Sequence, residues 1–346
     1  MKVGIAGATA YTSLELIKLL LRHPRVEINY LGVRREGSPR ISEIFPSLRR
    51  LIELPCSGLE PEDVPEGVEL LFVTLPPKVS MNYVPKYLRR GVRVIDFSAD
   101  YRFKDPAVYE KWYKTSHTDP EGLKGAVYGL PELYRKEIIG ASLVSNPGCY
   151  PVSTILPLAP LLKKGLVEPT DIIVDSKSGV SGRGREATEA SHYCECNENI
   201  EAYSVGTHRH TPEIEEVLTD RTGMRVKVYF TPHLAPMDRG ILSTIYARHK
   251  GSVGEEALRE TLKSFYQEEP FIRIKETGEF PRTKEVTDTN FCDVSLNVVG
   301  ERVILLSAID NLIKGASGEA VQNMNVMFGF EEALGLCKGM NGYCTI

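Results

Sequence analysis

Residues 2–21 read KVGIAGATAYTSLELIKLLL, and this stretch decides the fold. A short apolar run ends in Gly7, and leucines then recur at helical spacing behind the hydroxyl residues Thr12 and Ser13. The order predicts a strand, a glycine turn and a helix. The alternation of apolar runs with helical segments continues at 27–33, 69–75, 79–90 and 93–97. We therefore expect an α/β fold, because near-continuous apolar strands between helices form parallel sheets covered on both faces.

The second half of the sequence has a different character. Strand candidates lie at 171–177, 226–231, 240–248, 293–299 and 302–308, and the last two join through Val299-Gly300-Glu301, typical of a hairpin. We expect a Rossmann-type doubly wound domain over 1–148 and a second α+β domain with a mainly antiparallel sheet over 149–314. Helical periodicity returns from Gly315 to Leu336, so residues 315–346 are expected to pack back onto the first domain.

Composition limits the possible partners and setting. A length of 346 residues favours two domains, and 42% hydrophobic with 25% charged residues is typical of globular proteins. A formal charge of −4 gives no broad basic field for nucleic acid or anionic membrane, and the apolar runs are too short to span a bilayer. The first residues predict a strand and not a signal peptide, and seven scattered cysteines do not suggest a disulfide framework. We expect a cytoplasmic protein.

The glycine turn is a candidate cofactor site. Glycines between a first strand and a first helix let the backbone approach a pyrophosphate, whose charge the helix N-terminus favours. A tight turn without a nucleotide has the same pattern, so position in the βαβ unit carries the hypothesis. The candidate cofactor residues here are Gly4, Gly7, Ala8, Thr9, Ala10, Tyr11 and Thr12.

Two arginines follow the second predicted strand. Arg34 and Arg35 stand where an NAD enzyme usually carries an acidic residue for the ribose 2′-hydroxyl. Guanidinium groups there suit the 2′-phosphate of NADP(H), although a solvated basic loop reads the same way.

Cys149 is the candidate nucleophile. It precedes Pro151, which suits a first helical turn, and a helix start stabilises thiolate over thiol. Pro157 and Pro160 are expected to kink or end this helix. A buried structural cysteine is the alternative interpretation.

The segment 206–214 places His208 and His210 beside an arginine before another predicted helix. An imidazole titrating near neutrality is a natural acid/base partner for a cysteine. Zinc held with Cys194 and Cys196 is a competing interpretation, but the cysteine spacing lacks the usual intervening loop, so we expect no metal.

The motifs together resemble one family almost from end to end: the N-acetyl-gamma-glutamyl-phosphate reductases, within the aspartate-semialdehyde dehydrogenase superfamily. The resemblance is carried by Gly4–Thr9, Asp96–Arg102, Tyr128–Leu133, Asn146–Tyr150, Ser178–Gly182, His208–Ile214 and Phe230–Leu234. The sequence departs from the family at Ala10 and Ser13, where glycine is usual, and at Pro77, where histidine is common.

The resemblance implies roles for individual residues. Cys149 looks like the nucleophile and His208 the acid/base, with His210 and Glu213 beside them in the substrate site. Arg102 resembles the family's phosphate-site arginine, and Arg239 is expected to help bind the substrate carboxylate. Loops similar to those that line the nicotinamide pocket supply Ser178, Gly179, Ser181, Gly182, Asn311, Lys314 and Gly315.

The expected activity is the NADPH-dependent reduction of N-acetyl-L-glutamyl 5-phosphate to the semialdehyde in arginine biosynthesis, through a thioester on Cys149. The same chemistry on an aminoadipyl phosphate in lysine biosynthesis is an alternative that the motifs barely separate. A non-catalytic NADPH-binding redox sensor is an alternative of another class. By resemblance to the family, we expect a homodimer or homotetramer.

Overall fold

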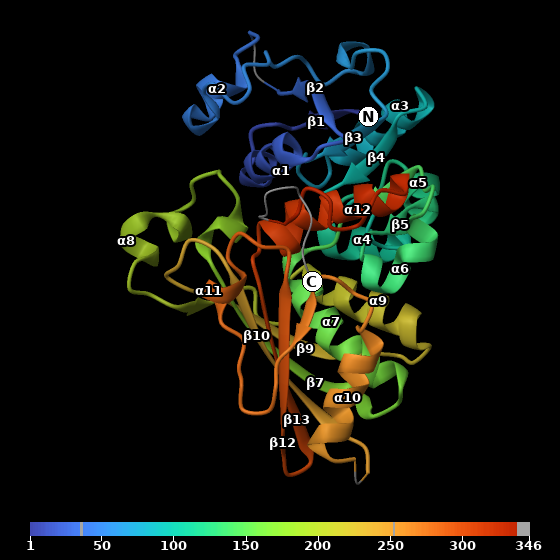
Figure 1. Ribbon diagram of the computed structural model, residues 1–346, viewed down its shortest axis with the longest axis vertical. Coiled ribbons are helices and arrows are strands. Elements are labelled where there is room, and N and C mark those ends of the chain that lie inside the picture. Colours follow the sequence, from blue (N-terminus) through green and yellow to red (C-terminus); the bar gives the residue numbers. More distant parts are fainter. Residues whose placement is uncertain (35–36, 252, 338–346) are drawn as a thin grey trace. The chain divides into compact units, whose positions relative to one another are not determined.

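The computed structural model describes residues 1–34, 37–251 and 253–337 (Figure 1). The chain forms two compact units. One consists of Met1–Pro147 with the described part of Ala316–Ile346, and the other is Gly148–Gly315. Each unit has its own sheet, so the polypeptide leaves the first unit after Pro147 and returns to it at Ala316.

The first unit contains a six-stranded sheet in the order β2-β1-β3-β4-β6-β5, and every recorded pair is parallel. Its strands are β1 (Lys2–Ala6), β2 (Glu27–Gly32), β3 (Leu70–Val73), β4 (Arg93–Asp96), β5 (Val127–Tyr128) and β6 (Leu143–Ser145). The strands β1, β3 and β4 are almost wholly buried, as a sheet covered on both faces requires. The predicted doubly wound parallel sheet is confirmed.

The helices of this unit follow the strands in the expected alternation. They are α1 (Tyr11–Arg22), α2 (Ile41–Ile44), α3 (Val84–Arg89), α4 (Pro106–Tyr113), α5 (Pro120–Gly125), α6 (Pro131–Ile138) and α12 (Gly318–Phe328). The C-terminal α12 packs against α1, α6 and β4. Its residues from Gly318 to Met327 are all buried, so the helix belongs to the interior of the unit.

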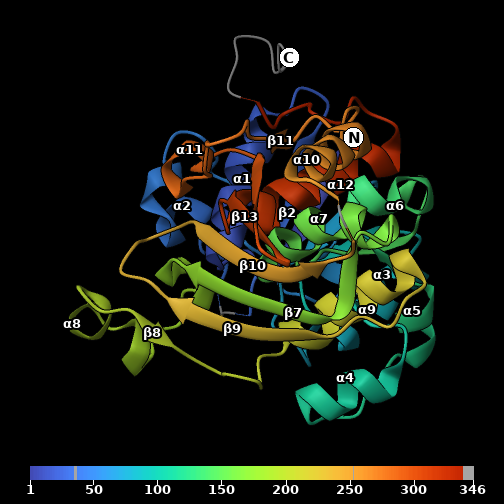
Figure 2. The same cartoon turned by 90° about the horizontal axis from the view of Figure 1, so that it is seen from below.

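The second unit contains a seven-stranded mixed sheet in the order β11-β12-β13-β10-β7-β9-β8. Its strands are β7 (Val167–Ser178), β8 (Glu201–Ala202), β9 (Val228–Leu234), β10 (Ile241–His249), β11 (Ile272–Ile274), β12 (Cys292–Val299) and β13 (Arg302–Ile309). The expected hairpin joins β12 to β13, with Val299 opposite Arg302. Figure 2 shows β10, β7 and β9 side by side; β10 and β7 are antiparallel, whereas β7 and β9 are parallel.

The helices of the second unit are α7 (Cys149–Lys163), α8 (Tyr193–Cys196), α9 (His210–Thr222), α10 (Glu255–Phe265) and α11 (Thr283–Val286). The central helix α7 packs on β7, β10 and β13 and also contacts α9 and α10 (Figure 1). Residues Tyr150–Leu162 are all buried, which makes α7 the core of the unit.

The expectation that Pro157 or Pro160 could end this helix is wrong, since α7 continues to Lys163. Each proline removes an N–H and leaves the carbonyl four residues earlier without its helical donor. The Ser307 hydroxyl donates to the Ser153 carbonyl at 2.5 Å, and the Tyr266 hydroxyl donates to the Leu156 carbonyl at 2.6 Å. Side chains from other elements therefore replace the bonds that the prolines remove.

Candidate active site

The turn between β1 and α1 has the backbone geometry expected of a cofactor loop. Gly7 has φ +102°, and a Cβ there would lie 2.8 Å from the Thr74 hydroxyl oxygen. A Cβ on Gly4 would lie 2.7 Å from a methyl group of Leu71. Both positions therefore require glycine. Gly7 needs it for its backbone conformation and for close packing against Thr74, which follows β3, and Gly4 needs it for close packing against Leu71 of β3.

The amide groups of this turn divide into two sets. The N–H groups of Gly7 and Ala8 both donate to the Gly32 carbonyl, at 2.9 and 3.0 Å, and so tie the turn to the end of β2. The helix α1 begins at Tyr11, and its N-cap residue Ala10 has no side-chain cap. The amides at the start of α1, including those of Tyr11 and Thr12, are thus the groups suited to a pyrophosphate.

Ser13, an expected departure from the family that the sequence resembles, makes contacts within this turn. Its buried hydroxyl donates to the Gly7 carbonyl at 2.9 Å and lies 3.0 Å from the Thr74 hydroxyl. The Ser13 hydroxyl therefore adds contacts that fix the turn.

Two arginines, Arg34 and Arg35, were predicted to select NADP(H). Arg34 is exposed shortly after β2, and Arg35 lies outside the described residues.

Arg102 lies at the carboxyl ends of two parallel strands. Its Nη2 donates to the carbonyl of Phe97 just after β4 at 2.7 Å, and its Nε donates to the carbonyl of Asn146 just after β6 at 2.9 Å. Ligands of open α/β sheets bind outside this edge. The guanidinium is thus fixed where an anion-binding arginine is expected.

The structure places Cys149 at the first residue of α7, behind the N-cap Gly148. The Gly148 N–H donates to the buried carboxylate of Glu213 at 2.8 Å, which fixes the loop that precedes the cysteine. A Cβ on Gly315 would lie 2.7 Å from the Cys149 Cβ, so this glycine is required for close packing beside the sulfur-bearing residue. The thiol is half-buried and not disulfide-bonded.

His208 lies in a cluster of rings from several elements of the same unit. Its ring centroid is 5.5 Å from that of Tyr150, 5.6 Å from Tyr203, 5.3 Å from Phe230 and 4.8 Å from His210. Burial, with a smaller effect of the Arg209 charge, lowers the pKa of His208 to about 4. The Tyr150 and Tyr203 hydroxyl groups are 3.0 Å apart and join the cluster to the first turn of α7.

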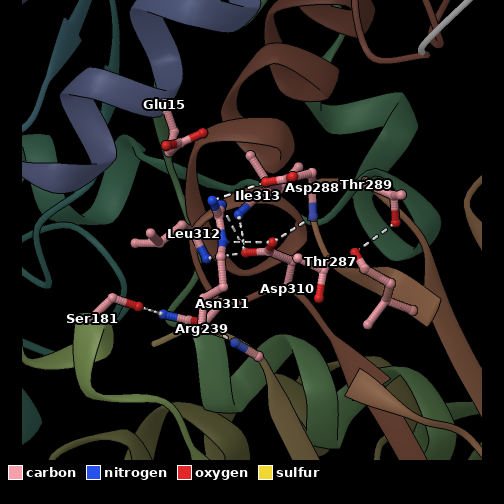
Figure 3. A network of polar contacts seen from close by, with 12 residues as sticks. Glu15, Ser181, Arg239, Thr287, Asp288, Thr289, Asp310, Asn311, Leu312 and Ile313 are labelled. Carbon is pink, nitrogen blue, oxygen red and sulfur yellow. Dashed lines mark hydrogen bonds and ion pairs between the residues drawn. The ribbon is translucent and has the colours of Figure 1, made fainter. Parts of the chain in front are cut away.

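Arg239 is the centre of a polar network rather than a free cation (Figure 3). Its Nε and Nη2 contact the two carboxylate oxygens of buried Asp310, at 2.9 and 3.2 Å, and its Nη1 contacts Asp288 at 2.9 Å. Burial raises the pKa of Asp310, and the Arg239 charge partly opposes this shift. The expected contact with a substrate carboxylate stays a prediction, because these bonds already occupy the guanidinium.

The same network connects the predicted nicotinamide loops. The Asn311 side chain accepts from the Gly240 N–H at 2.7 Å and donates to the Ser181 hydroxyl at 3.1 Å (Figure 3). A Cβ on Gly179 would lie 2.6 Å from the Asp238 carbonyl oxygen. Three loops, following β7, preceding β10 and following β13, are therefore held together within the second unit.

The remaining predicted residues of these loops lie in the same region of the second unit. Ser178 is buried, and its hydroxyl lies 3.1 Å from the position of a Cβ on Gly182. Lys314 is also buried, with Nζ 5.7 Å from the centre of the Phe271 ring. His210 begins α9, half-buried beside His208.

Two family models cover most of the chain. Residues 2–141 match the NAD binding domain of semialdehyde dehydrogenase, and residues 149–311 match the semialdehyde dehydrogenase dimerisation domain. The N-acetyl-gamma-glutamyl-phosphate reductase of Geobacter metallireducens is 51% identical over 339 residues, which cover 97% of this chain and 98% of that protein. The protein of the same name from Desulforudis audaxviator is 49% identical over 97% of this chain and 98% of its own.

The chain belongs to the N-acetyl-gamma-glutamyl-phosphate reductase family. Solved structures agree with the fold of this reductase family. Aspartate semialdehyde dehydrogenase II of Vibrio cholerae superposes with a TM-score of 0.71 at 16% identity, covering 94% of this chain and 97% of that one. The Candida albicans aspartate semialdehyde dehydrogenase, solved with NADP, gives a TM-score of 0.72 at 15% identity, with 94% and 97% of the chains covered.

Sequence reasoning missed several residues of the candidate site. Tyr150, Tyr203, Asp288 and Asp310 were not singled out, although two of them carried a local signal. Tyr150 follows Cys149 directly, and Asp310 precedes the Asn311 loop. Tyr203 and Asp288 are distant in sequence from the groups that they contact, so only the fold brings them there.

Within residues 1–34, 37–251 and 253–337, no group of three or more His, Cys, Asp or Glu side chains could hold a metal ion. No helix of the described chain is long and apolar enough to cross a membrane. No disulfide bond is formed by Cys56, Cys149, Cys194, Cys196 or Cys292, whereas Cys337 is disulfide-bonded.

Proposed function

We propose that this protein reduces N-acetyl-L-glutamyl 5-phosphate with NADPH, giving N-acetyl-L-glutamate 5-semialdehyde and phosphate in arginine biosynthesis. The observation that carries the proposal is the family membership, with relatives of that name about half identical over nearly their whole length. The position of Cys149 at the start of α7 supports it, because a helix N-terminus favours the thiolate needed to attack an acyl phosphate.

The predicted first domain, over 1–148 with 315–346, is proposed to bind the cofactor. Gly7 lets the backbone approach the pyrophosphate of the cofactor, and the start of α1 offers amide groups to it. The guanidinium of Arg34 suits the 2′-phosphate. NADPH, when bound, supplies a hydride. Loop residues of the second unit, including Ser181 and Asn311, are proposed to shape the pocket for its nicotinamide.

The predicted second domain, over 149–314, is proposed to carry the chemistry. Cys149 attacks the acyl carbon, a thioester forms and phosphate leaves; reduction of the thioester and release of the sulfur give the aldehyde. Arg102 is proposed to bind the phosphate and His208 to act as the acid/base, with His210 and Glu213 in the substrate site. Arg239 is proposed to help bind the substrate carboxylate. The enzyme is proposed to be cytoplasmic and a homodimer or homotetramer.

Replacing the sulfur tests the thioester route. Cys149→Ala should abolish arsenate-dependent reduction of NADP⁺ by N-acetylglutamate semialdehyde, because no other group is placed to form the thioester. NADPH binding, followed by fluorescence titration, should be unchanged. Cys194→Ala is the matched control, since that cysteine is exposed and should be dispensable. Turnover by the Cys149 variant would reject the route.

The same assay separates the possible substrates. One methylene in a shaped pocket typically changes kcat/KM by about 10- to 200-fold. We therefore expect N-acetylglutamate semialdehyde to exceed its longer aminoadipate homologue by at least about tenfold. A preference for the longer compound would move the enzyme to the lysine alternative while leaving the thioester chemistry intact.

A further inference from the structure

Asn146 has a partner for each of its four polar atoms within the first unit. Its backbone N–H donates to the Asp96 carbonyl at 2.7 Å, and its side-chain Nδ2 donates to the Ala316 carbonyl at 2.9 Å. Its Oδ1 accepts from the Asn323 Nδ2 at 3.1 Å, and its backbone carbonyl accepts from the Arg102 Nε at 2.9 Å. Asn146 is almost fully buried, so these bonds are shielded from water. It therefore connects an arginine of the proposed site to the C-terminal helix α12.

The direction of the Asn146 carbonyl has little freedom. Pro147 follows it, and a proline restricts the backbone of the residue before it by crowding the N–H and Cβ of that residue. The bonds at the backbone N–H and at both side-chain polar atoms restrict it further. A displacement of the Asn146 side chain must therefore move the carbonyl that holds the Arg102 guanidinium.

Asn323 uses both hydrogens of its side-chain amide. Its Nδ2 donates to the Gly129 carbonyl at 2.8 Å as well as to the Asn146 Oδ1, and an amide nitrogen has two protons to donate. Gly129 follows β5 and Asn146 follows β6. These two strands pair through only two residues of β5, so the Asn323 side chain joins their ends where the ladder has stopped.

The fit around the Asn323 amide is close. A Cβ on Gly129 would lie 2.6 Å from the Asn323 Nδ2 and 2.7 Å from a methyl group of Val144, so a side chain at position 129 would displace the amide. Asn323 is fully buried, and it lies on a helix whose residues Gly318–Met327 are all buried. The bridging amide is therefore carried by an interior element and not by a surface side chain.

The network brings together separate parts of the sequence. Arg102, Gly129 and Asn146 belong to three different motifs that carry the family resemblance, and Asn323 lies 177 residues beyond Asn146. The proposed reaction assigns a chemical role to Arg102 but to none of the other three. Their hydrogen bonds all lead to the carbonyl that accepts from the Arg102 Nε.

We propose that Asn323 is a positioning residue for phosphate binding, which acts through Asn146 to hold the Arg102 guanidinium. The guanidinium donates to carbonyls at the ends of two strands, those of Phe97 and Asn146, and Asn323 fixes the second of these. Ordering a long side chain during binding costs free energy, and a side chain that is already fixed avoids this cost. The inference rests on the phosphate-binding role proposed above for Arg102.

The reverse reaction measures phosphate binding separately from cofactor binding. N-acetylglutamate semialdehyde is oxidised with NADP⁺ and inorganic phosphate, and the KM for each is determined. Asn323→Ala removes both donors, so we expect the KM for phosphate to rise by about tenfold and the KM for NADP⁺ to change by less than about twofold. KM does not depend on the fraction of enzyme that is folded, so a loss of stability alone would lower only the apparent kcat.

Asn325 provides the matched control. It is the same residue type on the same helix, it is also fully buried, and its Nδ2 also donates to two carbonyls, those of Glu332 and Leu334. Asn325→Ala should lower the free energy of unfolding to a similar extent but leave the KM for phosphate unchanged. Asn323→Ser keeps one donor and should give an intermediate KM; it also provides the comparison if Asn323→Ala does not fold. A phosphate KM in the Asn323 variants equal to that of Asn325→Ala would overturn the proposal.

A double variant separates this inference from the proposed function. Arg102→Ala alone should raise the KM for phosphate by at least about tenfold. In that background Asn323→Ala should add less than about twofold, because no guanidinium is left to position. A further rise of about tenfold would overturn the positioning role while the role of Arg102 stands. An unchanged phosphate KM in Arg102→Ala would instead reject the phosphate-binding role on which the inference rests.

Discussion

The carboxyl group of Asp96 is a buried acid at the end of β4. The Ser80 hydroxyl donates to one of its oxygens through a short hydrogen bond, and the Ser98 hydroxyl donates to the other at 2.6 Å. Burial raises the pKa of Asp96 to about 7, the charge of Asp100 adds to the shift, and the serines and Arg102 oppose it. The first unit therefore folds around a carboxyl group that is protonated up to near-neutral pH.

Asp96→Asn should make stability less dependent on pH. The folded pKa of about 7 exceeds the reference value of 3.8, so the contribution of the protonated group is full below pH 3.8 and is lost as the pH rises through 7. This contribution of protonated Asp96 to the free energy of unfolding is on the order of 4 kcal/mol. Urea unfolding at about pH 5 and about pH 8.5 should show wild type weakening and the variant changing less. Exposed Glu66→Gln is the control, and equal slopes in wild type and Asp96→Asn would contradict the assignment.

The local structure around the sequence motifs was predictable, whereas the hydrogen-bond and ion-pair partners of the residues in them were not. The start of a helix at Cys149 follows from local residues, because Pro151 suits a first turn. The pairing of Arg239 with Asp310 joins positions 71 residues apart, and no local pattern encodes it. The sequence can thus identify a reactive cysteine, but not which arginine already has carboxylate partners.

At the scale of elements, the helix α7 shows why proline is an incomplete stop signal. Pro157 and Pro160 would end an exposed helix, since their missing N–H groups leave two carbonyls without donors. Here hydroxyl groups of Ser307 on β13 and of Tyr266 just after α10 take those places. The strands and most helices were predictable from local periodicity, but this compensation depends on residues more than a hundred positions away.

Tyr266→Phe should destabilise the second unit by about 1–3 kcal/mol, because the buried Leu156 carbonyl loses its donor. In a Pro160→Ala background the alanine N–H can bond to Leu156, so the same change should cost less. The free energy of unfolding is measured by urea titration of wild type, the two single variants and the double variant. The departure from additivity gives the interaction energy between the two positions. Tyr229→Phe, at a residue that is 65% exposed, is the control. An equal cost in both backgrounds would disprove the compensation.

For the whole molecule, the return of the chain to its first unit was expected from the helical pattern after Gly315. The interior position of α12 was not expected, because its buried face includes amide side chains that a sequence pattern assigns to solvent. Asn323 donates to the Gly129 carbonyl at 2.8 Å, and Asn325 donates to the carbonyls of Glu332 and Leu334 at 2.9 Å. The parallel pairs of the second sheet, such as β7 with β9, likewise depend on the fold.

A chain that ends at Gly315 should fail to form the first unit, although it contains every strand of that sheet. It lacks α12, whose residues Gly318–Met327 are buried against α1, α6 and β4, so these elements would expose apolar surface and unpaired polar groups. We expect no saturable NADPH binding by fluorescence titration and the loss of one cooperative transition in calorimetry. A chain that ends at Cys337 keeps α12 and should bind NADPH like the full chain. Equal NADPH affinity of the shorter and longer chains would show that the first unit folds without its C-terminal helix.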